Sequence, residues 1–180
     1  MNGLFHIYTG DGKGKTSAAT GLAVRFAGSG GRVLYAQFLK KDDSSELCSM
    51  KQLENIELIC CDKCFGFTFQ MSEETKAEAK SFYTDYFQRI VKVIELKREP
   101  GEAEYGLLVL DELATAYATK MIEPEAVLNF IKNRPKELEI VVTGRNAAPE
   151  LLELADYVSE IRKIKHPFDK GIGARKGIEM

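Results

Sequence analysis

The sequence predicts a single α/β domain with a mostly parallel β-sheet of about five or six strands flanked by helices. Two observations support this fold class. Short apolar runs, typical of buried parallel strands, alternate along the chain with segments typical of helices. A glycine-rich loop separates the first apolar run from the first helical segment, which is the context of a phosphate-binding loop. No repeat or linker divides the 180 residues, so residues 1–180 are expected to form one domain.

Length, composition and charge exclude several classes of protein. Hydrophobic residues make up 44% of the chain and charged residues 29%, as in globular proteins. The formal net charge of −2 argues against nucleic acid as a partner and against a RecA-like nucleic-acid motor. The N-terminus has no signal-like pattern and no apolar run reaches the length of a membrane span. A cytoplasmic protein without a membrane partner is therefore expected.

The glycine-rich loop has the sequence GDGKGKT over residues 10–16 and follows an apolar run over residues 4–9. Its glycines allow turns that point backbone N–H groups at an anion, and a helix expected from Lys15 to Ala27 adds the positive end of its dipole. Lys15 is expected to bind phosphates and the Thr16 hydroxyl to ligate Mg²⁺. Because Thr9 stands where the general motif has its first glycine, the loop is a variant P-loop. The fold class is thus a P-loop NTPase-like, RecA-type domain.

The later elements follow in the expected alternation. A long helix should begin after Ser72, a favourable N-cap, carry apolar residues to Leu96 and stop at Pro100-Gly101. Residues 40–49 indicate a loop or an irregular helix. Further strands are expected over 32–38, 56–60, 107–110, 138–143 and 157–164, and further helices over 124–132 and 149–155.

The apolar run over residues 107–110 ends in two carboxylates, Asp111 and Glu112. In a parallel sheet the carboxyl ends of the strands share the edge that carries the phosphate-binding loop, so both side chains should lie beside the phosphates. Carboxylates are natural ligands for a Mg²⁺ already held by a hydroxyl and by phosphate oxygens. The predicted Mg²⁺ ligands are Thr16, Asp111 and Glu112. The alternative is an acidic pair that caps a helix.

Four cysteines lie within seventeen residues: Cys48, Cys60, Cys61 and Cys64. Cys61 and Cys64 form a C-x-x-C motif. A structural zinc site would show a second pair or histidines at matching spacing, and a thioredoxin-like motif would open a helix. Reduced thiols in a loop are the simplest interpretation, with zinc and redox roles as alternatives.

Several further segments are particular rather than general. They are Val33 to Lys40, Gly66 to Phe69, Val109 to Leu113, Arg134-Pro135, Val142 to Asn146 and Ile164 to Glu179. Together with the loop from Tyr8 to Thr16, they make the sequence resemble the P-loop type of ATP:corrinoid adenosyltransferase along nearly its whole length. The variant loop is itself the form found in this family.

The resemblance implies an enzyme that transfers the 5′-deoxyadenosyl group of ATP to the Co(I) centre of a corrinoid, forming adenosylcobalamin and releasing triphosphate. Co(I) is a strong nucleophile without a proton, so no general base is needed. The implied catalytic residues are Lys15, Thr16 and Glu112, and Mg²⁺ is the implied cofactor. The implied ATP-binding residues are Gly10, Asp11, Gly12, Lys13, Gly14, Lys15, Thr16, Ser17 and Arg25. For Arg25, a solvated helix charge is the alternative.

The resemblance also implies a corrinoid site. Phe67 and Phe69 match an aromatic pair that displaces the lower axial ligand of Co(II), although the family commonly has tryptophan at the second position. Arg145 and His166 match corrinoid or nucleotide contacts. An electron donor such as a flavoprotein reductase and a homodimer are expected. Longer relatives carry an N-terminal extension that closes over the corrinoid, so closure here is expected to be weaker or to come from a partner.

Two other functions fit the same residues. A phosphoryl-transferring NTPase or kinase would use Glu112 to polarise water or a hydroxyl and would yield ADP. A nucleotide-gated module that binds and delivers a corrinoid would use the aromatic loop without any turnover. The identity of the product separates the three readings.

Overall fold

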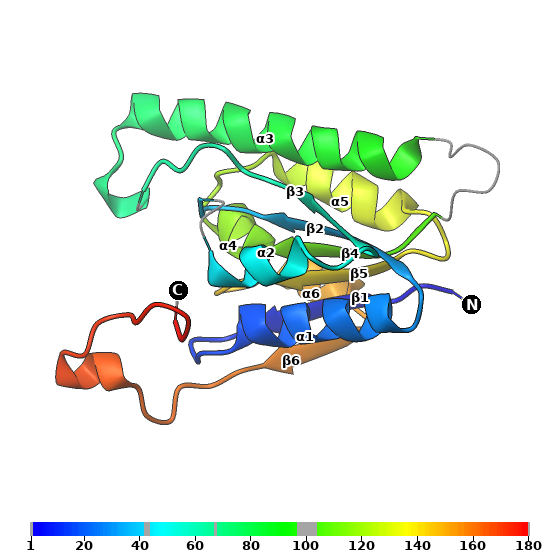
Figure 1. Ribbon diagram of the computed structural model, residues 1–180. Coiled ribbons are helices and arrows are strands. Elements are labelled where there is room, and N and C mark those ends of the chain that lie inside the picture. The colour runs from blue at the N-terminus through cyan, green and yellow to red at the C-terminus, as the bar shows by residue number, and fades with distance from the viewer. Residues whose placement is uncertain (1, 42–43, 67, 97–103, 180) are drawn as a thin grey trace.

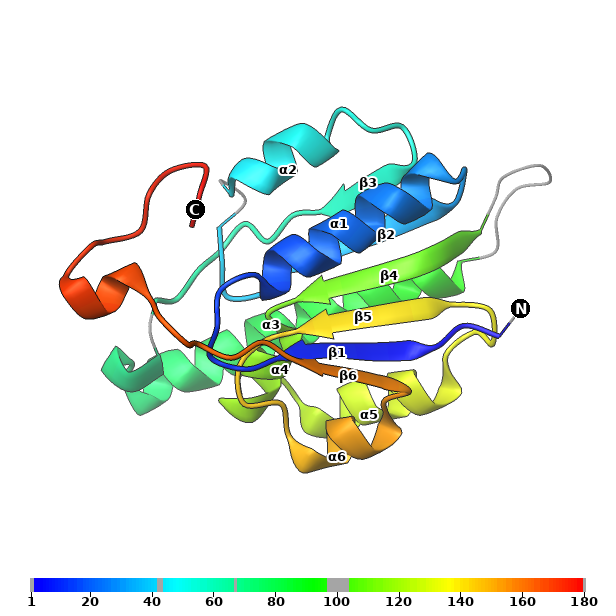
Figure 2. The same ribbon diagram turned by 90° about the horizontal axis from the view of Figure 1, so that it is seen from below.

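The computed structural model describes residues 2–41, 44–66, 68–96 and 104–179. Within them the chain forms one six-stranded sheet in the order β3-β2-β4-β5-β1-β6, and every pair of neighbouring strands is parallel (Figures 1 and 2). The strands are β1 (Phe5–Thr9), β2 (Arg32–Gln37), β3 (Ile56–Ile59), β4 (Tyr105–Asp111), β5 (Glu139–Thr143) and β6 (Tyr157–Glu160). The predicted fold class is confirmed.

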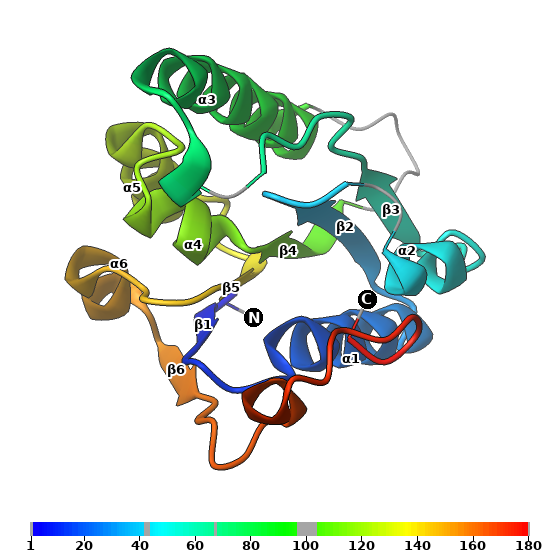
Figure 3. The ribbon, with the colours of Figure 1, turned by 90° about the vertical axis from the view of Figure 1, so that its left-hand side faces the viewer.

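Helices cover both faces of the sheet, as the apolar strands require. Successive strand residues point to opposite faces, so Leu34 and Leu108 lie in one hydrophobic cluster and their neighbours Val33 and Val109 in the other. One face carries α1 (Lys15–Gly28) and α2 (Ser45–Met50), and the other carries α3 (Glu73–Glu95), α4 (Leu113–Ala118), α5 (Pro124–Asn133) and α6 (Pro149–Leu154) (Figure 3). Both cores are therefore closed by helix-to-sheet packing.

Most predicted elements are present with ends that differ by a few residues. Ser72 caps α3 as expected, since its side chain accepts a hydrogen bond from the Thr75 backbone N–H at 3.1 Å. The stop predicted at Pro100-Gly101 lies outside the described residues. The strand predicted over 157–164 ends at Glu160, and α4 was not predicted. Of the two options for residues 40–49, the helical one is realised in part by α2.

The carboxyl ends of the strands define one edge of the sheet, where the chain also places its C-terminal segment. Residues 161–179 run along this edge past the start of α1 and contain the short 3₁₀ helix η2 (Pro167–Lys170) (Figures 1 and 2).

Within the described ranges, no helix combines the length and apolarity that crossing a membrane requires.

Candidate nucleotide and metal site

The loop between β1 and α1 turns at glycines. Gly10 and Gly14 have φ angles of 105° and 117°, which residues with a side chain rarely adopt. A Cβ atom at Gly10 would lie 2.3 Å from the carbonyl oxygen of Ile161, and one at Gly12 would lie 2.8 Å from the same oxygen. The loop therefore packs against the backbone that follows β6, and this contact leaves no room for side chains at either position.

Two hydrogen bonds fasten the loop to that segment. The Gly12 N–H donates to the Ile161 carbonyl at 2.7 Å, and the Lys163 N–H donates to Asp11 Oδ1 at 2.8 Å. The hydrogen bond from Lys163 lowers the pKa of Asp11 because it stabilises the carboxylate. The expectation that the loop glycines point their N–H groups at an anion is thus wrong for Gly12, whose N–H binds the protein itself.

Lys15 lies folded against its own loop. Only 7% of its surface is exposed, and its Nζ donates to the carbonyl oxygens of Gly10 and Gly12, both at 2.8 Å. Burial lowers the pKa of Lys15, and repulsion from Arg145 lowers it further. A phosphate that binds here would offer this ammonium a charged partner in place of two neutral carbonyls.

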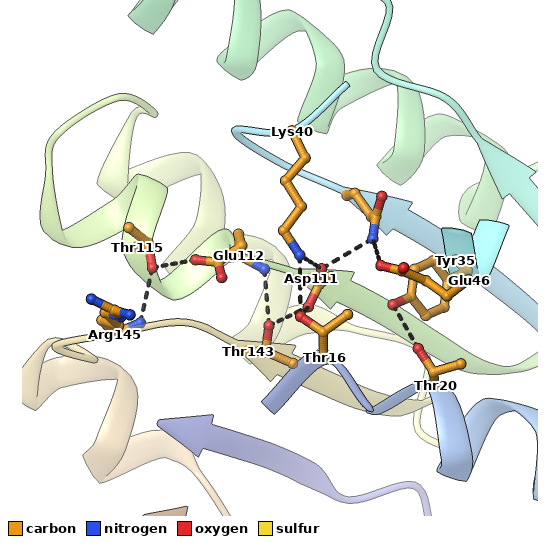
Figure 4. A network of polar contacts seen from close by, with 11 residues as sticks. Thr16, Thr20, Tyr35, Lys40, Glu46, Asp111, Glu112, Thr115, Thr143 and Arg145 are labelled. Carbon is orange, nitrogen blue, oxygen red and sulfur yellow. Dashed lines mark hydrogen bonds and ion pairs between the residues drawn. The ribbon is translucent and has the colours of Figure 1, made fainter. Parts of the chain in front are cut away.

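Asp111, at the end of β4, is the centre of a buried polar network (Figure 4). Its side chain has no exposed surface. Oδ1 accepts hydrogen bonds from the hydroxyls of Thr16 at 2.9 Å and Thr143 at 2.6 Å. Oδ2 accepts from Lys40 Nζ at 2.8 Å and from Gln37 Nε2 at 3.2 Å. Four side chains from three segments of the carboxyl edge thus converge on one carboxylate.

Lys40 supplies the positive charge of this network. Its Nζ donates to Thr16 Oγ1 at 3.1 Å as well as to Asp111. Burial alone would lower the pKa of Lys40, but the charge and hydrogen bond of Asp111 outweigh burial and raise it. The buried carboxylate is therefore paired with an ammonium that stays protonated near neutral pH.

Glu112 points away from this pair. It has a left-handed backbone (φ 62°) at the start of α4, and its N–H donates to Thr143 Oγ1 at 3.0 Å. Its Oε2 accepts a hydrogen bond from Thr115 Oγ1 at 2.6 Å, and the same Thr115 oxygen accepts from the Arg145 N–H at 2.9 Å. Figure 4 shows the Glu112 carboxylate on the Thr115 side of the network, away from Thr16.

A cavity of about 310 Å³ opens over the loop. It is lined by residues 11–17, Lys40, Glu112 and Arg145 and by residues 166–168, 172–174 and 178–179 of the C-terminal segment. A second cavity of about 480 Å³ adjoins it, shares Asp11 and Arg145 and is lined also by Thr9, Gly10, Asn146, Ala147, Glu160, Arg162 and Lys163. Three lysines and an arginine around the first cavity make it suited to a polyanion.

Comparisons with known proteins place the chain in a family. A family model described as "ATP:corrinoid adenosyltransferase BtuR/CobO/CobP" matches residues 1–180. The chain belongs to this family. Corrinoid adenosyltransferases of Escherichia coli and Pseudomonas aeruginosa are 31% and 35% identical to it, over 98% and 99% of this chain and 85% and 84% of their own. It is therefore an adenosyltransferase with ATP and a corrinoid as substrates, and the resemblance seen in the sequence is confirmed.

Solved structures resemble the adenosyltransferase in fold alone. A KaiC-like protein from Pyrococcus horikoshii aligns with a TM-score of 0.51 at 15% identity over 92% of this chain and 75% of its own. The cytoplasmic domain of EssC aligns with a TM-score of 0.50 at 16% identity over 96% of this chain and 35% of its own. Both alignments agree with the P-loop NTPase-like class.

Most predicted site residues of the adenosyltransferase meet at the two cavities. Residues 11–17, Glu112, Arg145 and His166 line the first cavity, and Gly10 lines the second. Asp111 lies beneath them, in contact with Thr16. His166 precedes η2, where its Nδ1 accepts a hydrogen bond from the Phe168 N–H at 3.2 Å.

Three predicted site residues remain: Arg25, Phe67 and Phe69. Arg25 is exposed in the last turn of α1, ten residues and about 15 Å of helix beyond Lys15. Phe67 lies outside the described residues, and of Phe69 only the backbone is described, in a 3₁₀ turn over Thr68–Gln70. Roles for these three residues stay predictions.

The cysteines of the adenosyltransferase are free thiols. The Cys61 thiol donates to the Lys63 carbonyl at 3.2 Å, and the Cys64 thiol donates to the Leu39 carbonyl at 3.4 Å. In the described part of the chain, no group of three or more histidine, cysteine or acidic side chains is arranged to hold a metal ion.

Sequence reasoning missed Lys40, Gln37 and Thr143 as parts of the site. Each lies at or just beyond the carboxyl end of a buried strand, where Asp111 also lies. Polar residues that end apolar runs in a predicted parallel sheet were thus the signal that could have found them. The sequence did not show which of these residues would reach the carboxylate.

Proposed function

We propose that this site transfers the 5′-deoxyadenosyl group of ATP to the Co(I) centre of a corrinoid and releases triphosphate, within one domain that spans residues 1–180. The observation that carries the proposal is that four cations line the cavity: Lys13, Lys15, Lys40 and Arg145. Triphosphate leaves with the electron pair of the broken bond, so the reaction needs positive charge where that group departs. These four side chains provide such charge.

The bond changes balance without a proton. The electron pair of Co(I) forms the bond to C5′, the bond from C5′ to the triphosphate oxygen breaks, and that oxygen keeps its electron pair. The cobalt is thereby oxidised by two electrons. The protein then has to position C5′ against the cobalt and to stabilise the departing charge. Lys15 fits the second task because triphosphate oxygens can replace the Gly10 and Gly12 carbonyls that its Nζ now contacts.

We assign Thr16, Asp111 and Glu112 to Mg²⁺. Thr16 Oγ1 and Asp111 Oδ2 fit a cation, because they already accept hydrogen bonds from the Lys40 ammonium at 3.1 and 2.8 Å. The donor atoms are all oxygen, as Mg²⁺ prefers. Glu112 lies at the cavity, but its carboxylate would have to turn from Thr115 to join them. When bound, Mg²⁺ neutralises charge on the triphosphate.

For the corrinoid we propose Phe67 and Phe69 as the residues that favour a cobalt without its lower ligand. The loop that precedes them is anchored on α3 through Phe65. Phe65 packs against Phe82 and Tyr83 with ring centroids 5.6 and 5.7 Å apart. Replacing Phe67 and Phe69 by alanine should slow a reaction started from Co(II) far more than one started from prepared Co(I). Equal losses would contradict ligand displacement.

The deciding experiment is an anaerobic incubation with Mg-ATP and cobalamin reduced chemically to Co(I). The visible spectrum reports light-sensitive adenosylcobalamin, and chromatography separates triphosphate from ADP. The two products should appear in equal amounts. ADP and phosphate without a spectral change would indicate an NTPase or kinase, and no turnover by folded protein would indicate a corrinoid-binding module.

The remaining assignments follow the family resemblance. We propose a homodimer and a flavoprotein reductase that supplies the electron for Co(II). We also propose a cytoplasmic location, which the four free thiols support because reducing compartments keep cysteines unpaired. Arg25 is proposed as an ATP contact only if the nucleotide extends along α1.

A further inference from the structure

Lys40 holds the place that the metal would take. Its ammonium bridges Thr16 Oγ1 at 3.1 Å and Asp111 Oδ2 at 2.8 Å, which are oxygens of two proposed Mg²⁺ ligands. A Mg²⁺ bound to Thr16 Oγ1 at its usual distance of about 2.1 Å would lie at most about 5 Å from this nitrogen. Two cations so close inside a cavity repel each other strongly, so the ammonium and the metal compete for these oxygens.

Asp111 needs one of these two cations. Its side chain is fully buried, and a buried carboxylate without a counter-charge is strongly unfavourable. In the nucleotide-free protein Lys40 is the paired cation, and 32% of its side chain remains exposed toward the cavity. The neighbouring cations of the cavity, Lys13 and Lys15, have no hydrogen bond to Asp111 among the described residues. Among the described residues, Lys40 is therefore the cation that pairs directly with Asp111 before the metal arrives.

The backbone before Lys40 directs its side chain toward Asp111 and Thr16. The Phe38 N–H donates to the Asp111 carbonyl at 2.8 Å and extends the pairing of β2 with β4 by one step. Leu39 then adopts φ 59°, a left-handed conformation that costs free energy for a leucine. Its carbonyl accepts the Cys64 thiol at 3.4 Å. Leu39 is thus held by the Phe38 hydrogen bond before it and by the Cys64 hydrogen bond to its own carbonyl. Its left-handed backbone turns the chain so that the Lys40 side chain reaches Asp111 at the end of β4.

The Lys40 ammonium also has a second position open to it, in the cavity above the loop. It lines the 310 Å³ cavity together with residues 11–17, and its flexible four-carbon stem allows the ammonium to move from the carboxylate toward a polyanion in that cavity. A metal ion alone would displace Lys40 without giving it a new partner. A metal–polyphosphate complex would bring the new partner with it.

We propose that Lys40 is a tethered cation that excludes free divalent metal from the nucleotide-free protein and moves to the polyphosphate when a metal–nucleotide complex binds. Lys40 is thus a positioning residue that couples metal entry to nucleotide binding. The inference rests on the proposed nucleotide and metal site and is independent of the cobalt chemistry.

The test measures how tightly Mn²⁺, a paramagnetic substitute for Mg²⁺, binds to three nucleotide-free proteins. These are the wild type, Lys40→Met and Lys41→Met. Electron paramagnetic resonance reports the concentration of free Mn²⁺. Lys41→Met is the matched control, because Lys41 is the next residue and, within the described part of the chain, makes no hydrogen bond to the network. Lys40→Met should bind Mn²⁺ at least about tenfold more tightly than the wild type, since the competing charge is gone. Lys41→Met should match the wild type. Equal Mn²⁺ affinity in wild type and a folded Lys40→Met would overturn the proposal.

A second measurement uses the wild type, so that it decides even if Lys40→Met does not fold. The ¹⁵N-labelled side-chain ammonium of Lys40, assigned with Lys40→Arg, is followed by NMR. Its signal should stay in place on addition of Mg²⁺ alone at a concentration that saturates ATP and should shift when Mg-ATP is added. A signal that Mg-ATP leaves unchanged would overturn the proposal. Neither readout involves a corrinoid, so failure of adenosyl transfer and failure of this inference are observed separately.

Discussion

At the scale of single residues, the site holds its charges in partnerships that a substrate would exchange. Lys15 contacts two carbonyls of its own loop, and Lys40 contacts Asp111. Both side chains line one cavity, where Lys15 is buried and Lys40 is partly exposed. Such pre-paired cations cost little to keep in the folded protein and are already close to where a polyphosphate would lie.

Lys15→Ala should reduce the rate of adenosylcobalamin formation by at least about 100-fold, because a cation on the leaving group is lost from the transition state. The fold should persist, since the variant removes a buried charge and the loop keeps its hydrogen bonds to Ile161 and Lys163. The measurement is turnover with prepared Co(I), beside circular dichroism. Lys132→Ala, on the exposed side of α5, is the control. A folded Lys15→Ala with normal turnover would remove the loop lysine from catalysis.

Cys61 should be the slow thiol of the four. Burial raises its pKa to about 11, and only 3% of its surface is exposed. The thiolate is the reactive form, so at pH 8 about one thousandth of Cys61 is available even where reagent reaches it. Iodoacetamide should label the exposed Cys48 first, as mass spectrometry of the native protein would report. Unfolded protein should label all four, and equal native rates for Cys48 and Cys61 would contradict this burial.

At the scale of elements, the strands could be predicted and some of the helices could not. β2, β4 and β5 are buried on both faces, so each gives a continuous apolar run with turn residues nearby. α4 begins directly at the strand end, where Glu112 takes a left-handed backbone instead of a loop, and its six residues are too few to show a period. The alternation beyond Glu160 resembles a strand, but those residues have no neighbouring strand to pair with in the described chain.

The N-cap of α3 offers a test at this scale. Ser72→Ala removes the acceptor for the Thr75 N–H and should lower the free energy of unfolding by about 1 kcal/mol. Urea titration measures the change. Ser81→Ala, at an exposed position inside the same helix, should be neutral or slightly stabilising because alanine is the better helix former. A Ser72→Ala protein as stable as the wild type would show that the cap does not contribute.

At the scale of the whole molecule, strand order assembles the site. β5 lies between β1 and β4, so Thr143 at its end sits between the phosphate-binding loop and Asp111 and bonds to the carboxylate at 2.6 Å. The sequence predicted the loop and the carboxylates because their motifs are local. Of the C-terminal wall of the cavity, only His166 was predicted as a site residue, from the family resemblance. The basic, glycine-bearing composition of residues 163–177 is equally that of a solvated tail, and the wall depends on how β6 directs the chain past Gly10.

Truncation after Lys163 should show whether the C-terminal wall of the cavity contributes to nucleotide binding without contributing to the stability of the fold. The shortened chain keeps the bond from Lys163 to Asp11, and the residues removed are mostly exposed, so its melting temperature should change little. Its dissociation constant for Mg-ATP should rise by roughly tenfold, about 1.4 kcal/mol, because one side of the cavity is missing. Calorimetric titration measures the affinity. An unchanged dissociation constant would show that the C-terminal segment does not contact the nucleotide.

The edge position of β6 has a consequence for how the loop moves. All four residues of β6 are exposed, and in the described sheet β6 pairs with β1 alone. The chain just after it holds Gly12 and Asp11. Because edge elements fray at a lower free energy than the core, the phosphate-binding loop is released whenever β6 frays, long before the central strands open. The amide hydrogens of the loop should then exchange with solvent at the rate at which β6 frays, so the loop between β1 and α1 is locally no more stable than this edge strand.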